Sequence, residues 1–216
     1  MEKTWIGDLS LYRATPAVKK HDNPILFVPG MHEGGLIFEN WLEWAADMGW
    51  DAWALNLRGH HASRPVENFG KTSLMDYVED VEDVLREIGP AILVGHSMGG
   101  LIAQLVADRN LDIPAVVLLN SAPGHGIFPG NRHTLLRYWK PPYLIATALK
   151  RPLQPQKGDM MNLVFNNMSP EEADSAFQQM VPESGRAAQE LMFWWLFGKK
   201  VKIDCPVLVI GATNDR

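Results

Sequence analysis

The feature that most constrains this chain is the pentapeptide Gly95-His96-Ser97-Met98-Gly99. An apolar run at residues 91–94 precedes it, and a helical spacing of apolar residues follows it. A Gly-x-Ser-x-Gly sequence between a strand and a helix predicts a sharp turn whose serine hydroxyl is exposed as a nucleophile. Glycine is expected at positions 95 and 99, because a Cβ at either would strike the neighbouring strand or helix. Ser97 is therefore the first candidate catalytic residue.

Strands and helices are predicted to alternate along most of the chain. Runs typical of strands covered on both faces occur at residues 24–28, 51–57, 91–94, 115–119 and 207–210, and a looser alternation at 6–12 predicts an edge strand. Helical spacing is found at residues 36–48, 74–88 and 98–109. Ser73, with Asp76 three residues later, predicts the start of the second helix. The fold class is α/β, with a mostly parallel sheet sandwiched between helices.

The alternation of strand and helix patterns stops between about residues 124 and 200, where no convincing strand is found. This stretch is rich in aromatic residues, Met and Pro, and Ser169-Pro170 is a typical helix start. We interpret residues 1–123 as the first part of a core, 124–200 as an inserted helical cap, and 201–216 as the continuation of the core.

Composition and charge limit the partners and the cellular location that are expected. A net charge of -5 gives no reason to expect nucleic acid as a partner, and no apolar stretch reaches membrane-spanning length. The one cysteine, Cys205, excludes an internal disulfide, and the N-terminus lacks a signal-peptide pattern. These observations predict a cytoplasmic protein without a membrane span; they leave the oligomeric state open.

Four segments together resemble the α/β-hydrolase superfamily, from about residue 24 to the end of the chain. They are Val28-Pro29-Gly30-Met31, Asn56-Leu57-Arg58-Gly59-His60, the Ser97 pentapeptide, and Pro206-Val207-Leu208-Val209-Ile210-Gly211 running into Asn214-Asp215. Their order and spacing are more specific than any one segment. The resemblance implies the α/β-hydrolase fold (α/β, with an inserted helical cap) and a serine esterase-like or lipase-like activity.

The resemblance also implies roles for individual residues. Ser97 is expected to be the nucleophile, with the backbone N–H groups of Met98 and Met31 as the two oxyanion-hole donors. Asp215, which follows the last apolar strand, is expected to be the carboxylate that orients the catalytic imidazole. Asp204 precedes that strand and is the poorer candidate.

A catalytic histidine is expected after the acid, because the superfamily places its triad in the order Ser, acid, His. No histidine follows Asp215 in the given sequence, so we expect the chain to be a fragment whose last strand, histidine and closing helix lie beyond Arg216. Taken alone it should then be a weak or inactive catalyst. His96 is expected to point away from the Ser97 hydroxyl and to serve packing or hydrogen bonding.

The expected substrate is a small ester with a hydrophobic acyl or aryl group, cleaved through an acyl-Ser97 intermediate. Four residues are candidates for the pocket lining: His32, His125, Trp139 and Trp194. No cofactor is expected, and no histidine spacing suggests a metal site. Serine at position 97 argues against superfamily members that use an aspartyl ester to open epoxides or dehalogenate.

Three alternatives stay open at this point. The same fold could carry out C–C bond hydrolysis, acyl transfer or perhydrolysis. It could also bind a hydrophobic small molecule without turning it over. A fragment could further be only partly folded, because the strand at 207–210 may form an exposed sheet edge.

Overall fold

The computed structural model describes residues 1–109, 112–128 and 140–213. A seven-stranded sheet with the order β1-β2-β4-β3-β5-β6-β7 forms its centre. The strands are β1 (Glu2–Ile6), β2 (Leu9–Ala14), β3 (Ile25–Val28), β4 (Ala52–Leu55), β5 (Ile92–His96), β6 (Val116–Leu119) and β7 (Val207–Ile210). The five strands from β4 to β7 pair in parallel, whereas β1 and β2 pair antiparallel. The predicted mostly parallel α/β fold is confirmed.

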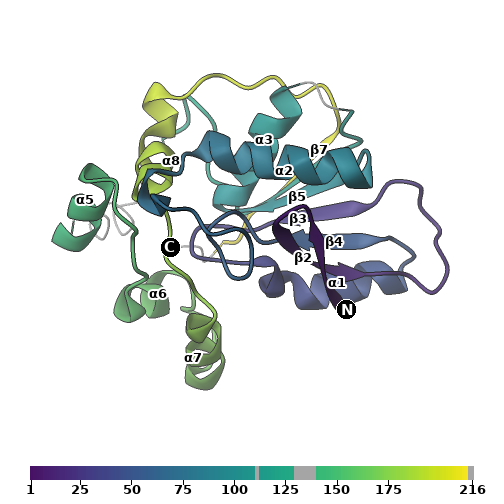
Figure 1. Cartoon of the computed structure of the whole chain (residues 1–216), viewed down its shortest axis with the longest axis horizontal. Helices are drawn as coiled ribbons and strands as arrows, with labels where there is room; N and C mark the ends of the chain where they lie inside the picture. Colours follow the sequence, from purple (N-terminus) through teal and green to yellow (C-terminus); the bar gives the residue numbers. More distant parts are fainter. Residues whose placement is uncertain (110–111, 129–139, 214–216) are drawn as a thin grey trace.

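Helices cover both faces of this sheet (Figure 1). On one face α2 (Leu74–Ile88) and α3 (Met98–Asp108) pack over the larger apolar core, which includes Tyr77 and Leu101. On the other face α1 (Glu39–Asp47), preceded by a 3-10 turn η1 (Gly35–Phe38), packs over a smaller core around Phe27 and Leu42. Strand β3 contributes to both cores, as expected of a strand covered on both sides.

The stretch 124–200 is helical where the structure describes it. Its elements are α5 (Pro141–Ala148), α6 (Lys157–Leu163), α7 (Pro170–Gln178) and α8 (Gly185–Phe197). They lie beside one end of the sheet (Figure 1). Helix α8 contacts α2, α5 and the short 3-10 turn η2 (Phe69–Lys71), whereas α6 and α7 surround an apolar cluster of Met160, Phe165 and Ala173. We call residues 124–200 the helical region.

Local signals explain several helix ends. Ser73 and Asp76 form a reciprocal capping box at α2, and Ser169 and Glu172 form another at α7. Gly89 ends α2 with a φ of 82°, a left-handed conformation that favours glycine.

Two predicted elements differ from the structure. The single edge strand expected at residues 6–12 is a β1–β2 hairpin, whose two-residue turn begins at Gly7 (φ 56°). The helix expected from residue 36 begins as the 3-10 turn η1, and α1 starts only at Glu39.

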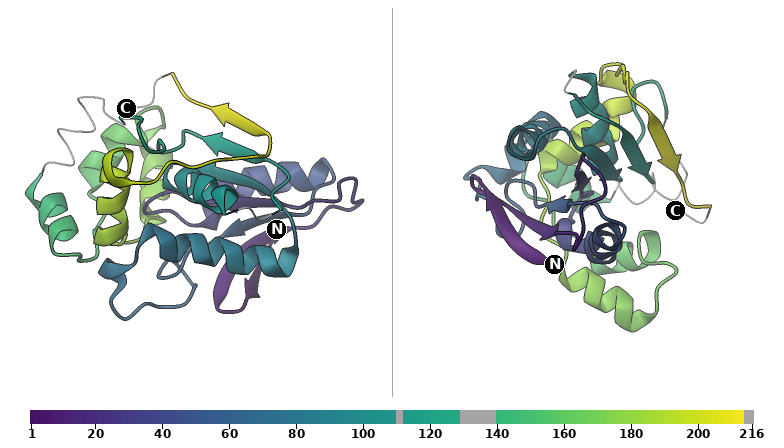
Figure 2. Two further views of the ribbon diagram at one scale, coloured as in Figure 1. Left: turned by 90° about the horizontal axis from the view of Figure 1, so that it is seen from above. Right: turned by 90° about the vertical axis from the view of Figure 1, so that its right-hand side faces the viewer.

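Strand β7 lies at one edge of the sheet (Figure 2). Its side chains are exposed to between 43% and 69%, although all four are Val, Leu or Ile. Both of its faces are therefore uncovered by the described residues. None of the helices in the described ranges is both long enough and apolar enough to cross a membrane.

Candidate active site

Ser97 occupies the turn between β5 and α3 with φ 49° and ψ −118°. A positive φ is sterically unfavourable for a residue with a side chain, so the turn holds Ser97 in a strained conformation. The two flanking glycines allow it: a Cβ on Gly95 would overlap the Gly99 carbonyl, and a Cβ on Gly99 would overlap the Val28 carbonyl. The steric reason predicted for glycine at positions 95 and 99 is confirmed.

Backbone bonds fix the position of the Ser97 residue. Its N–H donates to the Leu119 carbonyl (3.1 Å), and its carbonyl accepts from Gly100 N–H (3.0 Å) and Ala122 N–H (2.8 Å). Ser97 is half-buried, and its Oγ has no hydrogen-bond partner within the described ranges. The hydroxyl is thus held on a rigid frame and is chemically unengaged.

The loop after β3 passes directly beside this serine. A Cβ on Gly30 would lie 3.0 Å from the Ser97 Cβ, so the two backbones are in close approach. The backbone N–H of Met31 follows Gly30, and that of Met98 opens α3. Neither N–H has an acceptor among the residues that the structure describes. Two unpaired backbone donors therefore belong to the two segments that flank Ser97.

Glu33 and His96 form a pair that the sequence did not indicate. The Glu33 Oε2 accepts from His96 Nδ1–H (2.8 Å) and from Gly30 N–H (2.7 Å). Because a carboxylate only accepts, this contact places the proton on Nδ1 of His96. Hydrogen bonding was one of the two roles expected for His96, but Glu33 was not identified as its partner.

A cavity of about 710 Å³ lies at this end of the sheet. Its polar lining includes His32, Glu33, His96 and Asn120. Its apolar lining comes from η1 and the start of α1 on one side and from the helical region on the other, and includes Leu36, Ile37, Phe38, Trp41, Phe165, Met168 and Met180. Polar side chains of α1 and α7 also line it, among them Asn40 and Glu172. Ser97 is not one of the lining residues, although its neighbour His96 is.

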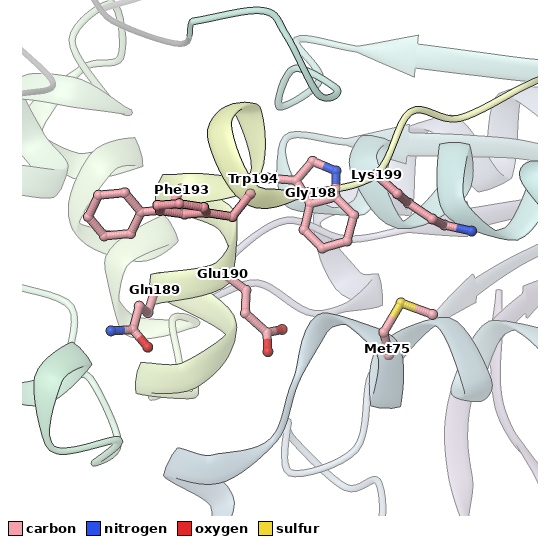
Figure 3. A pocket seen from close by; sticks show the side chains of 8 residues that line it. Met75, Gln189, Glu190, Phe193, Trp194, Gly198 and Lys199 are labelled. Carbon is pink, nitrogen blue, oxygen red and sulfur yellow. The ribbon is translucent and has the colours of Figure 1, made fainter.

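The four residues predicted to line the pocket do not all line this cavity. His32 lines this cavity, whereas His125 is not among its lining residues. Trp194 lines a different cavity of about 640 Å³, formed by Met75 of α2, by α8 and by the residues after α8 (Figure 3). The structure places Trp194 against α2 and not in the 710 Å³ cavity, and its role in substrate binding stays a prediction. Trp139 and the predicted acid Asp215 lie outside the described residues.

A cluster of buried polar side chains adjoins the cavity behind His32. The Glu183 carboxylate, which is fully buried, accepts from Tyr77 Oη–H (2.5 Å) and His60 Nε2–H (3.2 Å). For His60, burial favours the neutral ring, but the adjacent Glu183 charge and hydrogen bonds outweigh it and raise its pKa. For Glu183, burial opposes ionisation, but the His60 charge and the hydrogen bonds lower its pKa overall. Together these directions indicate an ionised pair.

His32 differs from His60 in charge state. Burial lowers its pKa, so the ring is neutral. Its Nδ1–H donates to the Val181 carbonyl (2.9 Å), which leaves Nε2 as a buried acceptor without a hydrogen-bond partner in the described part of the chain.

Comparison with known proteins agrees with this geometry. The sequence model of a family described as "Alpha/beta hydrolase family" matches residues 25–216. Epoxide hydrolase 3 of Xenopus tropicalis is 28% identical over 97 residues, which are 42% of this chain and 26% of that protein. The match thus spans about a quarter of the length of this relative.

Solved structures resemble the fold more extensively. An extracellular alpha/beta-hydrolase from a Paenibacillus species has a TM-score of 0.70 at 15% identity, covering 89% of this chain and 78% of its own. A structure from work on carboxylesterases of the thaumarchaeon Nitrososphaera gargenis has a TM-score of 0.67 at 18% identity, covering 96% of this chain and 78% of its own. At these identities the likeness shows the fold.

Proposed function

The chain belongs to the α/β-hydrolase family, and from that premise we propose that it is a serine hydrolase of carboxylic esters that acts through an acyl-Ser97 intermediate. The single observation that carries the proposal is the strained, half-buried Ser97 at the β5–α3 turn, with its hydroxyl unengaged beside a cavity-lining loop. Serine requires such a frame because its hydroxyl is a weak nucleophile unless it is aligned and activated.

The oxyanion hole is formed by the N–H groups of Met31 and Met98. Their lack of acceptors in the described ranges supports this assignment, since donors kept for a reacting oxygen remain unpaired in the resting enzyme. When Ser97 attacks the ester carbonyl, the negative charge develops on the former carbonyl oxygen. Each donor that stabilises it contributes on the order of 10²–10³ in rate.

Asp215 supplies the carboxylate of the triad and orients a histidine that takes the proton from Ser97. The described histidines near the site have other partners: His96 bonds Glu33, and His32 bonds Val181. These contacts support a base other than His32 and His96.

The helical region acts as a cap, and the 710 Å³ cavity beneath it receives the acyl or aryl group. Phe165, Met168 and Met180 from the helical region face the core across this cavity and support a hydrophobic group of medium size. The alcohol leaves after acylation, and water then releases the acid.

A fluorophosphonate probe tests the proposal on the full-length protein, together with turnover of p-nitrophenyl esters. Wild-type protein should be labelled once, and Ser97→Ala should lose both labelling and turnover. Ser175→Ala is the matched control for labelling, because Ser175 is an exposed serine of α7 and its loss should leave the single label in place. Labelling that persists in Ser97→Ala would overturn the proposal.

The other reactions of this fold are separated by product analysis. Peroxide, an alcohol acceptor or a β-diketone substrate would reveal perhydrolysis, acyl transfer or C–C hydrolysis at the same serine. A binder of a hydrophobic molecule would show ligand affinity without labelling of Ser97. The similarity to an epoxide hydrolase does not favour epoxide opening here, because position 97 carries Ser in place of the Asp of such enzymes.

A further inference from the structure

The residue after Met31 is held by a segment nearly 150 positions away along the chain. Val181 N–H donates to the His32 carbonyl (3.0 Å), and His32 Nδ1–H donates back to the Val181 carbonyl (2.9 Å). His32 N–H also donates to the Glu183 Oε2 at 3.4 Å, a weak contact that is longer than the about 2.7–3.2 Å of most N–H···O bonds. His32 adopts φ 69°, a left-handed conformation that needs such support.

Glu183 is itself fixed from four directions. Tyr77 of α2 and His60 of the loop after β4 bond its carboxylate, and Ser184 N–H donates to it at 2.6 Å. Its backbone exchanges two hydrogen bonds with Leu153, at 2.7 and 2.9 Å. The carboxylate therefore has little freedom to follow a moving loop.

The burial of the Glu183 charge indicates that this residue orients its neighbours rather than stabilises the fold. Removing a carboxylate from water is costly, and a buried ion pair often stabilises a fold no better than apolar side chains of the same volume. What the cluster supplies instead is a defined orientation for the groups that bond to it. One of those groups is the peptide that joins Met31 to His32.

We propose that Glu183 is a positioning residue for the oxyanion loop: by holding the His32 peptide it keeps the neighbouring Met31 N–H directed toward Ser97. On the other side of Met31, Gly30 N–H is bound by the Glu33 carboxylate at 2.7 Å. Both flanking groups are thus tied, while the Met31 N–H itself has no acceptor in the part of the chain that the structure describes. This inference rests on the proposed function, because only an oxyanion gives the Met31 donor a task.

The test compares binding of two ketones to full-length protein. A trifluoromethyl ketone forms a tetrahedral adduct with the serine and needs the oxyanion donors, whereas the matched methyl ketone occupies the cavity as an unreacted ligand. In Glu183→Gln we expect the affinity for the trifluoromethyl ketone and the kcat for a p-nitrophenyl ester to fall by about tenfold to a hundredfold. Methyl ketone affinity and KM should change less than about twofold. A loss of folded protein would not discriminate between the two ketones.

Two further variants complete the test. Glu190→Gln is the control: this carboxylate lies on α8 and bonds Leu74 N–H and Arg186, with no bond to His32, so both affinities should be unchanged. Tyr77→Phe removes only the hydroxyl that bonds Glu183. This variant takes the place of Glu183→Gln in the test if Glu183→Gln does not fold. It should lower trifluoromethyl ketone affinity in the same direction but to a smaller extent.

The outcomes distinguish the positioning role of Glu183 from the proposed serine mechanism. Equal affinities of wild type and the folded Glu183 or Tyr77 variant for the trifluoromethyl ketone, with unchanged kcat, would overturn the positioning role and leave the serine mechanism intact. Wild-type protein whose labelling does not depend on Ser97 would instead overturn the proposed function, and the positioning role with it.

Discussion

The imidazole of His96 donates through Nδ1 to the carboxylate of Glu33 across a distance of 2.8 Å, immediately before the strained serine. The same carboxylate oxygen accepts from Gly30 N–H, so one side chain joins the end of β5 to the loop after β3. This link fixes the spacing of the two segments that flank Ser97.

Replacing Glu33 by Ala should therefore destabilise the fold. Hydrogen bonds to charged groups contribute about 1.5–3 kcal/mol when partly buried, and we expect a loss in that range from urea unfolding. Glu39→Ala is the control, because Glu39 is exposed and a surface change of this kind stays within about 0.5 kcal/mol. Equal stability of the two variants would contradict the role assigned to Glu33.

Two helical glycines provide a matched pair for the steric requirement at the turn. Gly99→Ala in α3 should cost more than about 3 kcal/mol or prevent folding, because its Cβ would overlap the carbonyl oxygens of Val28 and Pro29. Gly158→Ala in α6 has open space and should raise stability by about 0.5–1 kcal/mol. Thermal unfolding of both variants measures the difference, and similar melting temperatures would refute it.

The His60–Glu183 pair should make stability depend on pH. The folded-state pKa of His60 is raised above its ordinary value of 6.5, so its stabilising contribution is present below that pH and is lost as pH rises through the folded pKa. The stability difference between wild type and His60→Gln should accordingly shrink from pH 6 toward pH 9. Burial chiefly lowers the pKa of His32 and of His61, and the His60 charge lowers both further, so part of the measured difference comes from these two residues. A difference that grows with pH would contradict the assignment.

The apolar edge at β7 should promote association of the 216-residue chain. Val209 is 69% exposed, and unpaired sheet edges with apolar side chains favour edge-to-edge pairing. Val209→Lys should shift size-exclusion elution toward the monomer without lowering the melting temperature. Val117→Lys, on the neighbouring β6 against the smaller core, should instead destabilise the fold. An unchanged elution volume for Val209→Lys would show that β7 does not mediate association.

Local chemistry made much of the fold predictable from sequence. Ser73 with Asp76, Ser169 with Glu172, and the glycines around Ser97 act within a few residues, so their patterns identify the elements they begin or join. The β1–β2 hairpin was missed although Gly7-Asp8, at its turn, is a typical two-residue hairpin signal.

Long-range contacts limited the prediction of the site. Glu33 and His96 are 63 positions apart, and Glu183 lies 123 positions from His60. Nothing in the composition around Glu183 distinguishes it from a surface glutamate, because its burial follows from packing between α2, α8 and two loops. Trp194 illustrates the same limit: its sequence suggests an apolar lining residue, but only the packing of α8 against α2 shows which cavity it lines.

Hydrogen bonds from residues 181–184 attach one part of the helical region to the core. Ser184 Oγ–H donates to the Thr72 carbonyl at 2.6 Å, and Glu183 bonds Tyr77 of α2 and two loop histidines. The start of α8 is therefore anchored to α2 and to these loops, and α5 packs against α8. Helices α6 and α7 enclose their own small cluster, and Asp159 of α6 accepts from Tyr143 of α5 at 3.1 Å. Under the proposed function, an acyl group in the cavity would therefore meet a fixed wall beside His32. The part of the substrate that lies there would be the part whose shape is most strictly selected.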